Sequence, residues 1–280
     1  MKLSICIATC DDFHRLQFTI QALKLYHPIC NSDECEFIVL DNSTLSTHQV
    51  ETKKFIEGPV RGKYFSFKSP QSSWNKYKAI AFADGDIVLG LDSHVLIQPE
   101  GINKLVNYFE RNPESKNLIQ GQLLYDPLTS GPTKLDGRWG SGMKGVWAES
   151  KPLLFDGEFP IDNMGMGLWA MRRRAWRGIS PYFRGFGSEE YTIHRYIKSW
   201  GGETILLGGL GWFHSFQRLS PPSFKLSNED RIFNYFLGAF DVYKTEDHPF
   251  YQEVIEHFTN EQVSRKIIDE AYAEAKSLIF

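Results

Sequence analysis

The sequence predicts an α/β protein whose mostly parallel sheet is flanked by helices. Residues 3–8, 36–40 and 87–91 are apolar runs typical of buried strands, and residues 11–26 and 74–83 between them are helix-like. Strands that alternate with helices favour parallel pairing, because each helix provides a crossover. The 280 residues can form one large core or two modest ones, and the net charge of −3 argues against a partner bound mainly through its phosphates.

The remaining elements follow in chain order. Residues 63–67 are a further strand candidate, and residues 100–111 a helix that begins after Pro99. Residues 126–162 are rich in Gly, Pro, Trp and Lys, which predicts loops with one or two strands. The rest of the chain predicts a strand at 165–171, a helix from about 188 to 201, a strand at 204–214, and helical segments at 232–243, 249–258 and 261–279.

Polar residues follow three of the predicted strands, at Thr9 to Asp12, Asp41 to Ser43 and Asp92 to His94. Ligands of parallel sheets bind outside the carboxyl ends of the strands, so we expect these clusters to converge on one crevice. Asp41 can accept hydrogen bonds from a base or a sugar there, although Asp41-Asn42-Ser43 is also an ordinary turn sequence.

Asp92 and His94 lie two residues apart at the end of a buried strand, so in an extended chain their side chains point the same way and can share a cation. His214 closes another apolar run, residues 204–213. Taken alone, the first pair also fits a turn that ends a strand, and His214 a structural histidine. Together, one carboxylate and two imidazoles favour a divalent metal such as manganese, with positions left for ligand oxygens.

A helix is predicted to begin at Ser188, whose side chain should cap it, and to end at Gly201-Gly202. Glu189 and Glu190 lie in its first turn. They either face a reacting centre or only interact favourably with the positive end of the helix.

Three other groups of side chains leave a functional and a structural interpretation open. For three tryptophans, stacking on sugar rings and packing in the core are both open: Trp139, Trp147 and Trp169. The best candidates for a basic, nucleic-acid-binding patch are Arg172, Arg173, Arg174 and Arg177. The cysteines, whose spacing matches no common zinc pattern, are Cys6, Cys10, Cys30 and Cys35. With no transmembrane segment or signal peptide recognised, we expect a cytoplasmic protein.

Over roughly residues 3–240, these motifs resemble the GT-A glycosyltransferases. SICIATCDDFHRL and FIVLDNST look like the nucleotide-binding half of family-2-type enzymes, and the later DSH stands in place of the commoner DxD. DSH followed by GMGLWAMRRRAW, GFGSEEYTIHRYIKSWGG and GWFH is most similar to the polypeptide N-acetylgalactosaminyltransferases. GSEE replaces their WGGEN, so a protein serine or threonine acceptor does not carry over.

The resemblance implies a GT-A, Rossmann-like fold and a set of binding residues. Thr9, Asp12 and Asp41 would contact the nucleotide, and Arg218 would contact the diphosphate from a mobile loop. Residues 215–228, which follow His214 and carry Arg218, form either a lid or a plain surface connection. The ligands of Mn2+ or Mg2+ would be Asp92, His94 and His214.

The resemblance also implies catalytic residues. Glu190 would be the base if the enzyme inverts the configuration of the sugar, with Glu189 orienting hydroxyl groups. Glu189 is the better candidate if the enzyme retains it.

We therefore predict a metal-dependent glycosyltransferase of hexosyl or N-acetylhexosaminyl type, which moves a sugar from a UDP-sugar to a saccharide or other hydroxyl acceptor. A modified nucleic-acid base is a less favoured acceptor.

Residues 1–240 would form the catalytic domain, with a nucleotide-sugar half at 1–125 and an acceptor half at 126–240. Residues 241–280 would form a C-terminal helical extension. The alternatives are a non-catalytic nucleotide-sugar-binding module and a nucleotidyltransferase. The latter usually carries a Gly-rich phosphate loop near its N-terminus, and TCDDFHR is not one.

Overall fold

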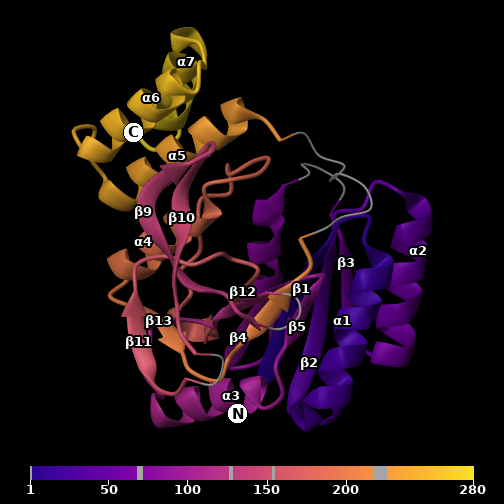
Figure 1. Ribbon diagram of the computed structural model, residues 1–280. Coiled ribbons are helices and arrows are strands. Elements are labelled where there is room, and N and C mark those ends of the chain that lie inside the picture. Colours follow the sequence, from indigo (N-terminus) through magenta and orange to yellow (C-terminus); the bar gives the residue numbers. More distant parts are fainter. Residues whose placement is uncertain (1, 68–71, 126–128, 153–154, 217–225) are drawn as a thin grey trace.

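A computed structural model describes residues 2–67, 72–125, 129–152, 155–216 and 226–280. It confirms the α/β class: helices flank a central eight-stranded sheet, and a long hairpin meets the C-terminal helices beyond it (Figure 1). The α-helices are α1 (Phe13–Tyr26), α2 (Ser46–Phe55), α3 (Gly101–Arg111), α4 (Glu189–Ser199), α5 (Asn228–Tyr243), α6 (Pro249–Asn260) and α7 (Arg265–Ser277). Shorter helical segments are η1 (Pro28–Asn31), η2 (Ile56–Val60), η3 (Ser73–Phe82) and η4 (Arg173–Ala175).

The central sheet has a parallel half and a mixed half. Its strands, in spatial order, are β11 (Glu158–Ile161), β13 (Thr204–Leu207), β6 (Leu118–Gln120), β12 (Leu168–Arg172), β4 (Ile87–Asp92), β1 (Leu3–Thr9), β2 (Cys35–Asp41) and β3 (Lys63–Ser66). The sheet is parallel from β4 to β3, the half that comes early in the sequence, and mixed from β11 to β12. β1 pairs in parallel with β2 and β4, whereas β12 is antiparallel to β4. Thr9 is paired with Asp41 and Ala8 with Asp92, so the three polar clusters converge as expected.

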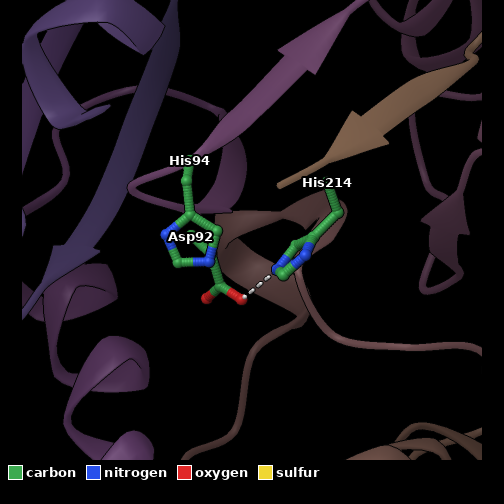
Figure 2. A group of neighbouring side chains, drawn as sticks. All are labelled: Asp92, His94 and His214. Atoms are coloured by element: carbon green, nitrogen blue, oxygen red, sulfur yellow. Dashed lines mark ion pairs between the residues drawn. The ribbon is translucent and has the colours of Figure 1, made fainter. Parts of the chain in front are cut away.

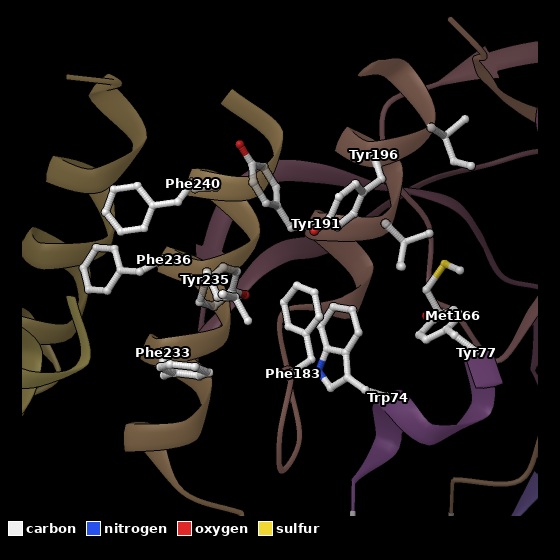
Figure 3. Close-up of a cluster of buried hydrophobic side chains, with 14 of the residues drawn as sticks. Trp74, Tyr77, Met166, Phe183, Tyr191, Tyr196, Phe233, Tyr235, Phe236 and Phe240 are labelled. Atoms are coloured by element: carbon white, nitrogen blue, oxygen red, sulfur yellow. The ribbon is translucent and has the colours of Figure 1, made fainter. Parts of the chain in front are cut away.

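The core occupies both faces of this sheet. One cluster packs β-strands against α1 and α3, and the other packs them against η3, α4 and the C-terminal helices. Figure 3 shows the second cluster, in which Trp74 of η3 stacks on Phe183 with ring centroids 3.7 Å apart. Gly90 lets Trp169 cross β4, because a Cβ at this position would lie 2.2 Å from the indole.

Residues 204–214 form two strands, where the sequence predicted one. β13 ends at Leu207, Gly209 adopts a φ of 78°, and the chain enters β14 (Trp212–His214). β14 belongs to a second sheet with β5 (Val95–Ile97), β7 (Leu123–Tyr125) and β8 (Thr129–Ser130). The glycine-rich break therefore sends the two halves of one apolar run into different sheets.

Two other expectations need correction. Residues 126–162, expected to be loops with one or two strands, contain four strands in their described part. They are β8, β11 and the hairpin of β9 (Pro132–Gly140) and β10 (Met143–Ser150). Ser188 does not cap α4: its φ is 74° and its side chain accepts no hydrogen bond from the helix backbone. The predicted end of that helix is confirmed, since Gly201 has a φ of 82° and Gly202 N donates to Ile197 O at 3.0 Å.

The C-terminal helices are attached to the segment that leads into α4. Arg184 pairs with Asp230 of α5 at 2.9 Å and with Glu274 of α7 at 2.7 Å. The helical segments expected at 249–258 and 261–279 are confirmed as α6 and α7. A domain boundary at residue 240 stays a prediction, and α5 continues past it to Tyr243. Among the described helices, none combines the length and apolar character needed to cross a membrane.

Candidate metal and nucleotide site

Strand pairing brings Asp92, His94 and His214 together from distant parts of the chain. β4 ends at Asp92, His94 lies in the turn before β5, and β14 runs antiparallel to β5 with His214 opposite Val95. Ser215 N donates to His94 O at 3.1 Å, which fixes the end of β14 beside the turn. The three side chains point toward one another, with their ligand atoms within 4.8 Å (Figure 2).

This arrangement fits a divalent metal ion. His214 Nε2 lies 3.5 Å from Asp92 Oδ2, and the two imidazole centroids are 4.6 Å apart. Ligands at about 2.1 Å from an ion place opposite ligand atoms about 4.2 Å apart, so only a small closure is needed. Two imidazoles and one carboxylate leave coordination positions open for ligand oxygens, as a catalytic rather than a closed structural site requires.

Asp12 lies behind His94. Its Oδ2 is 2.8 Å from His94 Nδ1 and accepts a hydrogen bond from Ser93 Oγ at 2.9 Å, while Oδ1 accepts one from Arg15 Nε at 2.7 Å. Burial works to raise the pKa of Asp12, but His94 and Arg15 outweigh it and hold that pKa below its usual value. A charged carboxylate at Nδ1 fixes the ring and leaves the other nitrogen available.

Lys76 of η3 is a site residue that sequence reasoning missed. Its Nζ lies 3.6 Å from Asp92 Oδ1 and donates to Met166 O at 3.2 Å. Burial on its own would raise the pKa of Asp92, but Lys76 and then His214 hold it well below the usual range. The Asp92 carboxylate is therefore charged at neutral pH, as metal binding requires.

The side chains of α4 that were predicted to be catalytic point into the same region. Glu189 is 2% exposed and accepts a hydrogen bond from Ser73 Oγ. Burial, followed by the negative charge of Glu189, raises the pKa of Glu190 to about 7, against the opposing effect of Lys76. Oε2 of each glutamate is buried without a hydrogen-bond partner among the described residues, so both retain unused acceptor capacity.

Of the predicted nucleotide residues in the described part of the chain, Thr9 borders a small cavity that Asp92 and His94 also line. This cavity, of about 90 Å³, is lined among others by Thr9, Asn42, Lys76, Asp92 and His94. Thr9 Oγ1 has no hydrogen-bond partner within the described structure. The cavity thus combines an unused hydroxyl, a lysine and the candidate metal ligands.

Asp41 lies deeper, behind the wall of that cavity. It is fully buried, and it accepts hydrogen bonds from Ser43 N at 2.7 Å and Tyr64 Oη at 2.9 Å. Asp11 supports the same loop by accepting from Thr44 N and Leu45 N, each at 2.9 Å. The contacts of Thr9, Asp12 and Asp41 with a nucleotide stay predictions.

Comparisons with known proteins bear on the fold of this chain. Residues 4–130 match the family model described as glycosyl transferase family 2. GalNAc-T7, solved with UDP, GalNAc and Mn2+, is similar with a TM-score of 0.68 and 15% identity, over 87% of this chain and 50% of that one. The mannosyltransferase PcManGT from Pyrobaculum calidifontis, solved with GDP-Man and Mn2+, has a TM-score of 0.55 and 10% identity, over 99% of this chain and 74% of that one.

A third solved structure, S. aureus TarS, has a TM-score of 0.55 and 15% identity, over 95% of this chain and 44% of that one. The chain has the GT-A glycosyltransferase fold. It spans half the length of GalNAc-T7 and less than half of TarS. A sequence search among curated proteins gave no match.

Within this GT-A fold, the three tryptophans have different surroundings. Trp169 is 1% exposed in the core, and Trp139 stacks on His257 with centroids 4.2 Å apart. Trp147 is 37% exposed and lies against Gly165, where an added Cβ would be 2.7 Å from its ring. Of the three, Trp147 is the one with an open face.

The arginines considered for a basic patch bind the protein's own backbone. Arg172 donates to Phe109 O, Arg173 to Gly85 O at 3.0 Å, Arg174 to Pro113 O, and Arg177 to Trp200 O at 3.3 Å. These contacts give each of the four arginines a structural partner, and a nucleic-acid acceptor stays the less favoured prediction. Arg218 and the central part of the expected lid lie outside the described residues.

Proposed function

We propose that this chain is a metal-dependent glycosyltransferase that moves a sugar from a UDP-sugar to a hydroxyl group of a saccharide. The observation that carries this proposal is the convergence of Asp92, His94 and His214 beside Lys76, which also interacts electrostatically with the two glutamates of α4. The family match over residues 4–130 supports it, and so do two similar structures solved with a nucleotide or nucleotide sugar and Mn2+.

Each part of the site has a proposed role. Mn2+ or Mg2+, bound by the three ligands, would neutralise the diphosphate of the donor. Thr9, with Asp41 behind it, would form the nucleotide side of the cavity, and Arg218 would contact the diphosphate. Asp12, first predicted as a nucleotide contact, is proposed as a positioning residue for His94 because of the 2.8 Å contact between them.

Glu190 is proposed as the general base of an inverting reaction. Its carboxylate would take the proton of the acceptor hydroxyl while that oxygen bonds to the anomeric carbon. The bond between this carbon and the diphosphate oxygen would break, with its electron pair leaving on the diphosphate. A pKa of about 7 suits a base that works near neutral pH. Glu189, held by Ser73, would orient hydroxyl groups.

A thermal-shift panel tests the donor site first. UDP, GDP and CMP would each be added with Mn2+ or with EDTA to the full chain and to the variant Asp92→Asn. A ligand at a hundred times its Kd stabilises a folded protein by about 2.7 kcal/mol, which is readily measured. We expect a Mn2+-dependent shift with UDP that Asp92→Asn loses. No shift with any nucleotide would contradict the proposal.

Turnover then separates an enzyme from a binding module. Release of UDP from UDP-sugars, with and without saccharide acceptors, should require Mn2+ and should fall by a factor of about 100 or more in Glu190→Gln. The anomeric configuration of the product, read by NMR, would show inversion. Binding of UDP without any turnover would support the non-catalytic alternative, and retention would reassign the main role to Glu189.

A further inference from the structure

A second cavity lies along α4, one helical turn beyond Glu190. Its volume is about 360 Å³, and its walls come from α4, the open end of the β9–β10 hairpin, β11 and β13. His194 is one of its lining residues, and its Nδ1 lies 2.5 Å from Glu190 O. A helix rises 1.5 Å per residue, so the two residues are separated by about 6 Å along the axis. The cavity shares no lining residue with the one beside Asp92 and His94, and it borders the helix that carries the proposed base.

Three cationic side chains on the cavity wall have no carboxylate partner within 4.0 Å in the described part of the chain. They are Lys151, Arg195 and Lys198. A fourth, Lys134, is paired with Glu149 across the hairpin. Asp162 and Glu203 also line the cavity, so with Glu149 its wall has three carboxylates against four cationic side chains, an excess of one positive charge. Lys198, Asp162 and Glu203 are exposed, so water screens the charges of all three.

Arg195 and Lys151 are the half-buried members of this group, and the Lys151 ammonium lies 4.2 Å from the centre of the Phe159 ring. The Arg195 guanidinium lies 4.7 Å from the centre of the Tyr191 ring, and Nη2 reaches Asn163 Oδ1 only at 3.4 Å. Its Nε is buried and has no hydrogen-bond partner among the described residues. A guanidinium with unused donors is suited to a carboxylate or a phosphate, which it can bind through two parallel hydrogen bonds.

An exposed aromatic side chain lies on β10, whose far end borders this cavity through Glu149. Trp147 of β10 packs on Gly165, and the next residue, Met166, accepts the hydrogen bond from Lys76. Four residues after Trp147, Lys151 reaches the cavity. Tryptophan combines a large apolar face with a polar edge, so it can pack on the face of a sugar ring. Trp147 and the cavity thus provide neighbouring positions for one extended acceptor.

We infer that this cavity is an acceptor subsite for an anionic saccharide, with a carboxylate or phosphate held by Arg195, Lys151 and Lys198. The inference rests on the proposed function, because it names the substrate class of the same enzyme. The hydroxyl groups of a neutral saccharide can also accept from Arg195, but only an anionic group adds charge-assisted hydrogen bonds and, with two oxygens, the bidentate geometry of a guanidinium.

Binding of simple probes tests the subsite without the donor site. Glucuronate, glucose 6-phosphate and glucose would be titrated into the full chain in EDTA, following the Arg195 Nε–H signal by NMR. We expect glucuronate or glucose 6-phosphate to shift this signal and to bind at least about tenfold more tightly than glucose. Whichever of the two charged probes binds better identifies the anion. Equal affinity for glucose, or no shift of the Arg195 signal, would overturn the inference.

Two matched lysine variants provide a test and its control. Lys198→Gln should weaken binding of the charged probe by about tenfold, which is the loss expected for one charge-assisted hydrogen bond. Lys54→Gln, at an exposed position of α2, should leave its affinity unchanged. An unchanged affinity in Lys198→Gln would contradict the inference.

The two proposals can fail separately. Binding of the charged probe at Arg195, with no release of UDP from any UDP-sugar, would contradict the proposed function and leave the anion site standing. Mn2+-dependent transfer to neutral saccharides, with acceptor KM values unaffected by Lys198→Gln, would contradict the anion site and leave the glycosyltransferase proposal standing.

Discussion

Asp12→Asn should separate the two roles considered for this residue. The substitution keeps the size of the side chain but removes the negative charge behind His94. In the structure three donors surround the carboxylate: Ser93 Oγ at 2.9 Å, Arg15 Nε at 2.7 Å and the His94 ring nitrogen at 2.8 Å. An amide has one acceptor oxygen, so the variant cannot satisfy all three. Nδ1 of His94 would lose its charged partner.

The expected effect is on metal affinity. Loss of an outer partner of a metal-binding histidine typically weakens metal binding by a factor of about 10 to 100, which corresponds to about 1.4 to 2.7 kcal/mol. A titration of Mn2+ followed by electron paramagnetic resonance would measure the Kd directly. The affinity for UDP in EDTA should stay the same, because the proposed role of Asp12 is to orient His94.

Two outcomes would refute this reasoning. A Kd for Mn2+ within twofold of that of the unchanged protein would show that the contact with His94 does not matter for the ion. A tenfold loss of UDP affinity in EDTA would instead place Asp12 against the nucleotide, as the family resemblance first implied. Asp33→Asn, at an exposed position before β2, is the control for a change of charge alone.

Three further predictions concern other charged groups. Because Glu190 must be deprotonated to act as a base and has a pKa of about 7, kcat/KM should rise with pH through about 7, and Glu190→Gln should lose this limb of the pH profile. Lys76→Met leaves the partly exposed Asp92 without its cation, so urea unfolding at pH 7 should show a loss of about 1–2 kcal/mol. Burial lowers the pKa of His194 to about 3 in the folded protein. As the pH falls, this histidine therefore takes up a proton in the unfolded chain at a higher pH than in the folded protein. Stability should therefore decrease below about pH 6.5 by up to about 1.4 kcal/mol per pH unit, and His194→Gln should lack this contribution in urea unfolding between pH 7 and 4.5.

Much of the fold could be predicted because hydrophobic periodicity is a local signal. The first strands and helices follow that signal, and the polar ends of β1, β2 and β4 converge because parallel pairing requires it. The division of residues 204–214 could not be predicted from hydrophobicity, since both halves are apolar. The glycines at 208 and 209 were the available signal, because a residue such as Gly209 at a φ of 78° interrupts a strand.

The candidate site was harder to complete from sequence. Asp92, His94 and His214 each follow an apolar run, which made them visible. Lys76 lies inside a helical segment, and only the packing of η3 beside β4 places its ammonium near Asp92. The contact between Asp12 and His94 is likewise long-range in sequence, so no local pattern could distinguish a nucleotide contact from a positioning role.

The candidate ligands belong to two different sheets, and this has a consequence for local stability. Asp92 ends a strand of the central sheet, whereas His214 ends β14 of the smaller one. An ion held by both would join the two sheets, so they could open only after it had left. Amide hydrogens of Leu96 and Phe213, which lie in the paired strands β5 and β14, should then exchange more slowly with Mn2+ than with a chelator. The metal would thus set the rate at which this part of the protein opens, in addition to any part in the reaction.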